Sequence, residues 1–308
     1  MNGKQSAGRQ LIERGTQGST MKRITFYGTL VITALLALVI TGNCQAQEVA
    51  PNDPRLQKLY DAEAKRWEMW VGADKKRRAE MVAEPVFRWQ NMSRDNGQTG
   101  AMYVWVDGGR PVVIGGVFSN AIGSDKRYVM HEFHALGPDR LFPDLRQSKN
   151  QWRPDNGIAM PRLPDSPEVE STAARVTLQL RTIGRDFAAN SVDDTKKRWE
   201  LRLLPKPLYR YEKPQGNIVD GALIAFVSDA GTDPEIILML EAREELGQKA
   251  WYYRAVRLSI SDLYVDYKGQ RVWSSLREEL NASYSNKDKT YFLCRDLAPD
   301  ELPNPILK

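Results

Sequence analysis

Two segments of the chain carry apolar side chains at the spacing of an amphipathic helix. In the second segment, successive apolar positions are separated by four, three, four, three and four residues, which places them on one helical face. Asp53-Pro54 and Ser166-Pro167 precede the two segments, and each pair joins a capping side chain to a proline at the first helical position. We therefore expect helices beginning at Pro54 and Pro167. Their apolar stripes are Leu56, Leu59, Tyr60, Trp67, Trp70 and Val71 in the first, and Val169, Ala173, Val176, Leu180, Ile183 and Phe187 in the second.

Each predicted helix is followed by short apolar runs separated by turn residues, a pattern typical of antiparallel strands. Asp107-Gly108-Gly109 joins two of these runs and is a strong hairpin signal, because glycine readily adopts the positive φ of a tight turn. The expected strands are 86–89, 101–106, 112–118 and 128–136 after the first helix, and 198–204, 208–211, 222–227, 235–243 and 251–258 after the second.

Four of these runs are apolar at every position rather than at alternate positions. Alternation is expected where one face of an antiparallel sheet is wet, so continuous runs predict strands that are covered on both faces. A helix would cover one face, and a second sheet would cover the other. The four runs are Ala101–Val106, Val112–Val117, Leu223–Val227 and Ile236–Leu240.

The two series of strands resemble each other at a nearly constant separation. Glu84–Trp89 matches Lys206–Tyr211 at 122 residues, and Gly100–Val106 matches Gly221–Val227 at 121 residues. Ordered matches of this kind predict internal duplication of one unit. The alternative is that any two antiparallel meanders share turns and aromatic residues.

These patterns predict an α+β fold of two helix-plus-antiparallel-meander units, each of the α-β4 type, related by internal duplication and with their sheets packed together. The expected organisation is a leader over residues 1–46, a first unit over 47–136, a Pro-rich connection over 137–166, a second unit over 167–273 and a C-terminal tail over 274–308.

The leader has the pattern of a secretory signal peptide. Met21-Lys22-Arg23 is followed by the apolar run Ile24–Ile40 and then by small residues at Cys44 and Ala46, which predicts cleavage before Gln47. Met21 is the expected start, because the residues before it are polar and serve no export signal. If the leader is not cleaved, residues 24–40 would anchor the protein in the membrane. The expected location is the periplasm or the extracellular space.

Removal of the leader changes the charge of the chain. The full sequence holds 44 Lys and Arg against 39 Asp and Glu, a net charge of +5. Residues 1–46 contribute five basic residues and one acidic residue, so the remainder has 39 against 38, or +1. A balanced surface of this kind does not favour nucleic-acid binding. Only Cys294 follows the leader, so a hydrophobic core rather than a disulfide must hold the exported fold.

Several short segments resemble those of a family of uncharacterised exported bacterial proteins. The resemblance spans most of the mature chain and implies export and a shared fold, with no established activity or catalytic residue. It rests on Pro85–Trp89, His131-Glu132-Phe133-His134, Pro207-Leu208-Tyr209-Arg210-Tyr211, Asp220–Val227 and Thr232-Asp233-Pro234-Glu235.

The strongest candidate chemistry is the segment that holds both histidines of the chain. His131, Glu132 and His134 could bind a metal ion or act in acid–base catalysis. The two histidines are three residues apart in a predicted strand, however, and side chains at that spacing point to opposite faces. Aligning the two units at 123 residues places them on Arg254 and Arg257, which favours a structural polar contact instead.

Other candidates have simpler structural interpretations. Gly115-Gly116 would allow close approach of a ligand, or would mark a bulge or a tight helix–sheet contact. Ser119 and Ser228 lie at strand ends without the flanking glycines of a nucleophile elbow. The basic cluster Lys75–Arg78 is interpreted as a solvated turn.

The sequence thus favours an exported, non-catalytic protein that binds or scaffolds an envelope component or a small ligand, as a monomer or homodimer. No cofactor and no nucleic-acid partner are expected, and the membrane is a partner only through an uncleaved leader. The alternative is an envelope hydrolase or metal-dependent enzyme that uses His131, Glu132 and His134.

Overall fold

A computed structural model describes residues 53–72, 74–91, 97–122, 126–145, 152–212, 214–228 and 231–295. Strands hold 52% of the described residues, and two α-helices with one short 3₁₀ turn at Arg277–Glu279 supply the helical part. The predicted α+β class of helix-plus-meander units is therefore wrong, because the chain is mostly β. Four strands that the sequence pattern did not predict add to the β content, at Trp67–Val71, Leu141–Leu145, Phe187–Val192 and Tyr291–Arg295. The leader over residues 1–46 lies outside the described residues.

Helix α2 (Pro54–Lys65) begins where the sequence predicts, and the side chain of Asp53 accepts a hydrogen bond from the Arg55 amide at 2.8 Å. The predicted apolar stripe extends to Val71, whereas the helix ends at Lys65. Strand β1 (Trp67–Val71) follows, with buried and partly exposed residues in alternation. That alternation is the signature of a strand, and β1 pairs with β8 (Leu141–Leu145) in a small sheet.

Helix α3 (Ala173–Arg185) begins six residues after the predicted start at Pro167, and Thr172 rather than Ser166 caps it. Phe187, expected on the helical stripe, is the first residue of strand β9 (Phe187–Val192). Each helix buries one face against a sheet and exposes its other face to solvent. The buried residues are Leu56, Tyr60, Glu63 and Ala64 on α2, and Val176, Leu180, Ile183 and Gly184 on α3.

The described strands form three antiparallel sheets. The smallest has the order β2-β1-β8, with β2 at Arg77–Arg78. The next has the order β17-β7-β6-β5-β3, with β4 also paired to β5; its strands are β3 (Glu80–Met81), β4 (Phe87–Asn91), β5 (Gln98–Asp107), β6 (Arg110–Ile122), β7 (Lys126–Ala135) and β17 (Tyr291–Arg295). Strand β17, from the predicted C-terminal tail, thus pairs with β7 of the first half of the chain.

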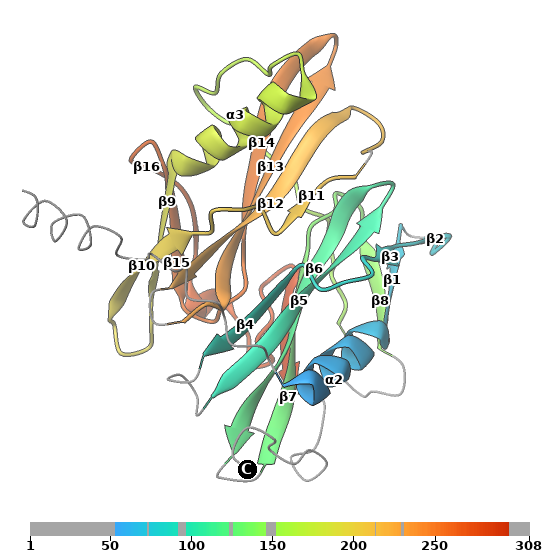
Figure 1. The fold of residues 1–308 in the computed structure, drawn as a ribbon, viewed down its shortest axis with the longest axis vertical. Coiled ribbons are helices and arrows are strands. Elements are labelled where there is room, and N and C mark those ends of the chain that lie inside the picture. The colour runs from blue at the N-terminus through green and yellow to red at the C-terminus, as the bar shows by residue number, and fades with distance from the viewer. Residues whose placement is uncertain are drawn as a thin grey trace, which may run out of the picture. The chain divides into compact units, whose positions relative to one another are not determined.

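The largest sheet has the order β14-β13-β12-β10-β9-β15-β16, with β11 also paired to β12. Its remaining strands are β10 (Arg198–Leu203), β11 (Tyr209–Arg210), β12 (Ile218–Ser228), β13 (Pro234–Glu245), β14 (Gln248–Arg257), β15 (Asp262–Tyr267) and β16 (Gln270–Ser275). In Figure 1, the yellow and orange strands of this sheet lie under α3. The teal and green strands β5, β6 and β7 lie beside α2.

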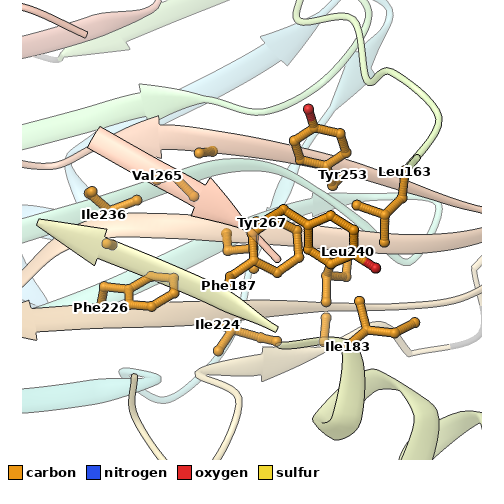
Figure 2. Close-up of a cluster of buried hydrophobic side chains, with 14 of the residues drawn as sticks. Leu163, Ile183, Phe187, Ile224, Phe226, Ile236, Leu240, Tyr253, Val265 and Tyr267 are labelled. Atoms are coloured by element: carbon orange, nitrogen blue, oxygen red, sulfur yellow. The ribbon is translucent and has the colours of Figure 1, made fainter. Parts of the chain in front are cut away.

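Three hydrophobic clusters hold these layers together. One lies between α2 and the sheet that holds β5, β6 and β7, called here the first large sheet. Another lies between α3 and the sheet that holds β12, β13 and β14, called the second large sheet. The third joins the inner faces of the two sheets, with Met102 and Ile114 from the first and Leu223 and Ile237 from the second. The prediction that the continuous apolar runs are covered on both faces is therefore confirmed. Figure 2 shows the α3 cluster, in which the rings of Phe187, Tyr253 and Tyr267 gather.

The pairing of strands recurs in the two halves of the chain. In each half, directly paired residues can be followed across three neighbouring strands, starting from an alanine whose side chain faces the helix. The ladders are Ala101–Val117–His131 in the first half and Ala222–Leu240–Tyr253 in the second. His131 therefore corresponds to Tyr253, and the alignment of the histidines onto Arg254 and Arg257 is wrong by one residue. Internal duplication itself stays a prediction.

Candidate functional site

The two histidines lie on opposite faces of strand β7, as expected for residues three apart on a strand. His131 faces α2 within the first cluster of apolar residues and has no exposed surface. His134 lies on the other face, 5% exposed, with its ring 6.3 Å from that of Tyr291. The two imidazoles therefore share neither a cleft nor a set of neighbours.

His131 lies between an indole and a carboxylate. The Nε1–H group of Trp67 donates to Nδ1 of His131 at 3.0 Å, so Nδ1 carries a lone pair and the proton of a neutral ring is on Nε2. Nε2 is 3.3 Å from Oε2 of Glu63, which also forms an ion pair with Arg66. Burial opposes ionisation of Glu63, but its hydrogen bonds with His131 and Arg66 outweigh burial and lower the pKa of the carboxyl group. Glu63 is thus a buried carboxylate that lies beside the ring of His131.

His134 is held in its neutral form. Its Nδ1–H group donates to the backbone oxygen of Ala135 at 2.7 Å. Burial lowers the pKa of His134 to about 3, and the positive charges of Arg254 and Arg257 act in the same direction. A histidine with this pKa does not exchange protons near neutral pH, which does not suit a general acid or base.

Glu132 lies between the two histidines in the sequence and contacts a different strand. Its Oε1 accepts a hydrogen bond from the hydroxyl group of Tyr291 at 2.6 Å, which ties β7 to β17. Burial and the charge of Glu132 together raise the pKa of Tyr291 well above its usual value. Among the described residues, no group of three or more His, Cys, Asp and Glu side chains is arranged to hold a metal ion. The three predicted site residues therefore make three separate contacts.

Gly115, Ser119 and Arg77 also make structural contacts, whereas Oγ of the buried Ser228 has no hydrogen-bond partner among the described residues. A Cβ atom on Gly115 would lie 1.7 Å from Cδ1 of Phe133, so the tight contact is with a neighbouring strand rather than with a helix. Oγ of Ser119 lies 2.6 Å from the hydroxyl group of Tyr60 and accepts from Nε of Arg127 at 2.8 Å. Arg77, in the basic cluster, forms an ion pair with Asp107 at 2.7 Å.

Sequence reasoning missed a buried ionic network between the two halves. Glu241, on β13, has no exposed surface, and its Oε1 accepts from Nε of Arg110 and from the hydroxyl group of Tyr211, each at 2.8 Å. Nε of Arg243 donates to the other carboxylate oxygen at 2.8 Å. Burial first, and then the charge of Glu241, raises the pKa of Tyr211 well above its usual value. An isolated glutamate in an apolar strand was the only available signal.

Sequence reasoning also missed a pocket between α3 and the second large sheet. The pocket has a volume of about 280 Å³, and its apolar wall is formed by Gly184, Leu203, Leu204, Pro205, Pro207 and Ile224. Arg181 and Arg185, both exposed on α3, form its rim. In the part of the chain that the structure describes, neither guanidinium group has an ion-pair partner. The pocket therefore offers an apolar surface beside two unpaired positive charges.

Comparison of the chain with protein-family models, with curated proteins and with solved structures finds no match. The resemblance to exported bacterial proteins stays a prediction. Neither of the two described α-helices has the length and apolar character needed to cross a bilayer. The predicted anchor at residues 24–40 lies outside the described residues. The geometry of the chain itself must therefore carry any functional argument.

Proposed function

We propose that the protein is an exported, non-catalytic binding protein of the cell envelope that holds a small, largely apolar ligand in the pocket beside α3. Export rests on the signal-peptide pattern of residues 1–46. The observation that carries binding is the pocket of about 280 Å³, with its apolar wall and two rim arginines that have no ion-pair partner among the described residues. Ligand sites are concave and mostly apolar, with a few polar groups that fix orientation, and the volume of this pocket lies just below their usual range of roughly 300–1,000 Å³.

A binding role agrees with the contacts of the candidate catalytic residues. A general base must reach the proton that it removes, either directly or through one water molecule. His131 is fully buried behind α2, and His134 is held neutral by burial. Their contacts stabilise the layers of the fold, so the geometry favours binding over the hydrolase alternative.

The proposal is tested with 8-anilinonaphthalene-1-sulfonate, a dye whose fluorescence rises on apolar surfaces. The wild-type protein is expected to bind about one dye molecule with saturable fluorescence. Filling the pocket with the double substitution Ile224→Tyr and Arg181→Asp should abolish that signal. The matched control is Leu178→Tyr with Arg175→Asp, since both residues lie on the exposed face of the same helix. Equal dye binding by both double variants, with native circular dichroism, would reject the pocket as the binding site.

A further inference from the structure

We infer that the ligand of this pocket is a single-chain amphiphile with an anionic head, of the chemical class of a fatty-acid carboxylate. The inference rests on the proposed function and names its ligand class. It is carried by a comparison of the pocket with the equivalent place beside α2, and by the charges that remain at the rim.

The two helices present corresponding residues to their sheets. The buried residues of α3 follow those of α2 by 120 positions, from Leu56 to Val176 and from Ala64 to Gly184. By the same separation, Arg181 corresponds to Asp61. A hydrogen bond from a strand to each helix also recurs, because Arg88 of β4 donates to Gln57 of α2 and Arg210 of β11 donates to Thr177 of α3. These recurrences give a common frame for the two places.

In the first half, a tyrosine fills the place that corresponds to the pocket. Tyr103 lies two residues after Ala101, just as Ile224 lies two residues after Ala222, so the two side chains face their helices at the same level. The hydroxyl group of Tyr103 donates to Oδ1 of Asp61 at 2.7 Å and bridges the strand and α2. Tyr103 is only 1% exposed. Sheet and helix are therefore closed together at this level.

In the second half, the same place is left open by three replacements. Ile224 is shorter than tyrosine, Gly184 has no side chain, and Arg181 replaces the aspartate that would accept a hydrogen bond. A Cβ atom on Gly184 would lie 3.2 Å from Cδ1 of Ile224, so even a methyl group there would narrow the pocket. The three replacements together create an apolar cavity where the other half has a hydrogen-bonded bridge.

The two positive side chains at the rim indicate that the ligand is anionic. Arg181 and Arg185 are one helical turn apart, and guanidinium groups bind carboxylates in a planar, bidentate geometry. The side chains of Leu203, Leu204 and Pro207, which line the wall, are apolar. A ligand that satisfies both features has an apolar chain along the wall and one anionic group at the rim.

The test uses isothermal titration calorimetry with two probes of equal chain length, decanoate and decanol, on the chain without residues 1–46. We expect decanoate to bind at least fivefold more tightly than decanol. Arg181→Gln with Arg185→Gln should remove that difference, because it removes the two positive charges at the rim. Both arginines are exposed, so their loss does not disturb the core. Arg175→Gln with Arg198→Gln, also at exposed positions, is the matched control and should retain it.

Other outcomes separate the inference from the proposed function. Equal binding of decanol and decanoate, lost in the Ile224→Tyr, Arg181→Asp variant, would overturn the anionic ligand class and leave the apolar pocket in place. If that variant binds both probes as the wild type does, or if the wild type binds neither probe, the pocket is not the site and both proposals are overturned.

Discussion

The ring of Phe133 occupies the space in which a side chain at Gly115 would lie, because a Cβ atom there would be 1.7 Å from Cδ1 of Phe133. The two residues are paired across β6 and β7. In the second half of the chain, Leu238 and Ala255 are paired at the corresponding rungs. Each pair thus combines one large and one small residue. The large residue is on the later strand, β7, in the first half and on the earlier strand, β13, in the second half.

This relationship predicts strong coupling between Gly115 and Phe133. We expect Gly115→Ala to cost about 2–3 kcal/mol of unfolding free energy, since overpacking displaces a buried ring. In a Phe133→Ala background the same change should cost less than about 1 kcal/mol, because the added methyl group then enters the space that the ring leaves. Gly116→Ala is the control: its Cβ atom would be 3.2 Å from Trp89, a milder contact. Urea denaturation measures all four variants, and additive costs at Gly115 and Phe133 would contradict the coupling.

The hydrogen bond from Trp67 to His131 predicts a structural role for that histidine. Trp67→Phe should cost about 1–3 kcal/mol, because it leaves Nδ1 of a fully buried imidazole without a donor. Trp70→Phe, on the partly exposed face of the same strand, should cost less than about 1 kcal/mol. Urea denaturation followed by circular dichroism gives both values. Equal costs would show that the hydrogen bond contributes nothing measurable.

The pKa of His134 predicts loss of stability in acid. Burial lowers this pKa to about 3 in the folded protein, against 6.5 for an ordinary histidine. Between these values the unfolded chain binds one more proton at this position, so stability rises with pH, by about 1.4 kcal/mol per pH unit from this group. The contribution is complete above pH 6.5 and is lost as the pH falls toward 3.

The control for this prediction is His134→Asn, which keeps a donor near the position of Nδ1 and removes the titrating group. The slope of unfolding free energy against pH, measured between pH 4 and 6, should be smaller in the variant by about 1.4 kcal/mol per unit. The same slope in both proteins would mean that His134 is not held neutral.

The network around Glu241 predicts a large cost for removing one charge. Glu241→Gln should cost about 3–5 kcal/mol, because it leaves the buried Arg110 without its carboxylate partner. Glu244→Gln, at an exposed position on the same strand, should change stability by less than about 0.5 kcal/mol. Thermal and urea unfolding report both. If Glu241→Gln costs no more than Glu244→Gln, the apolar cluster alone holds the two sheets together.

The sequence by itself determined the parts of this structure that depend on local pattern. Continuous apolar runs required strands covered on both faces, since no wet face tolerates such a run. Asp53-Pro54 specified the start of α2, and the spacing of His131 and His134 separated the two imidazoles. Each of these follows from backbone geometry within a few residues, where sequence and structure are directly linked.

Tertiary structure alone decided the rest. The sequence stripe that continued through Trp67 became strand β1 because its residues pair with β8, about seventy positions away. Strands β9 and β17, which the sequence did not predict, pair with strands distant in the chain, β15 and β7, and they raise the β content above the predicted α+β class. The pocket depends on Ile224, Gly184 and Arg181 meeting between a helix and a strand. Contacts between residues distant in the chain leave no periodic trace in the sequence, so only the folded arrangement could reveal them.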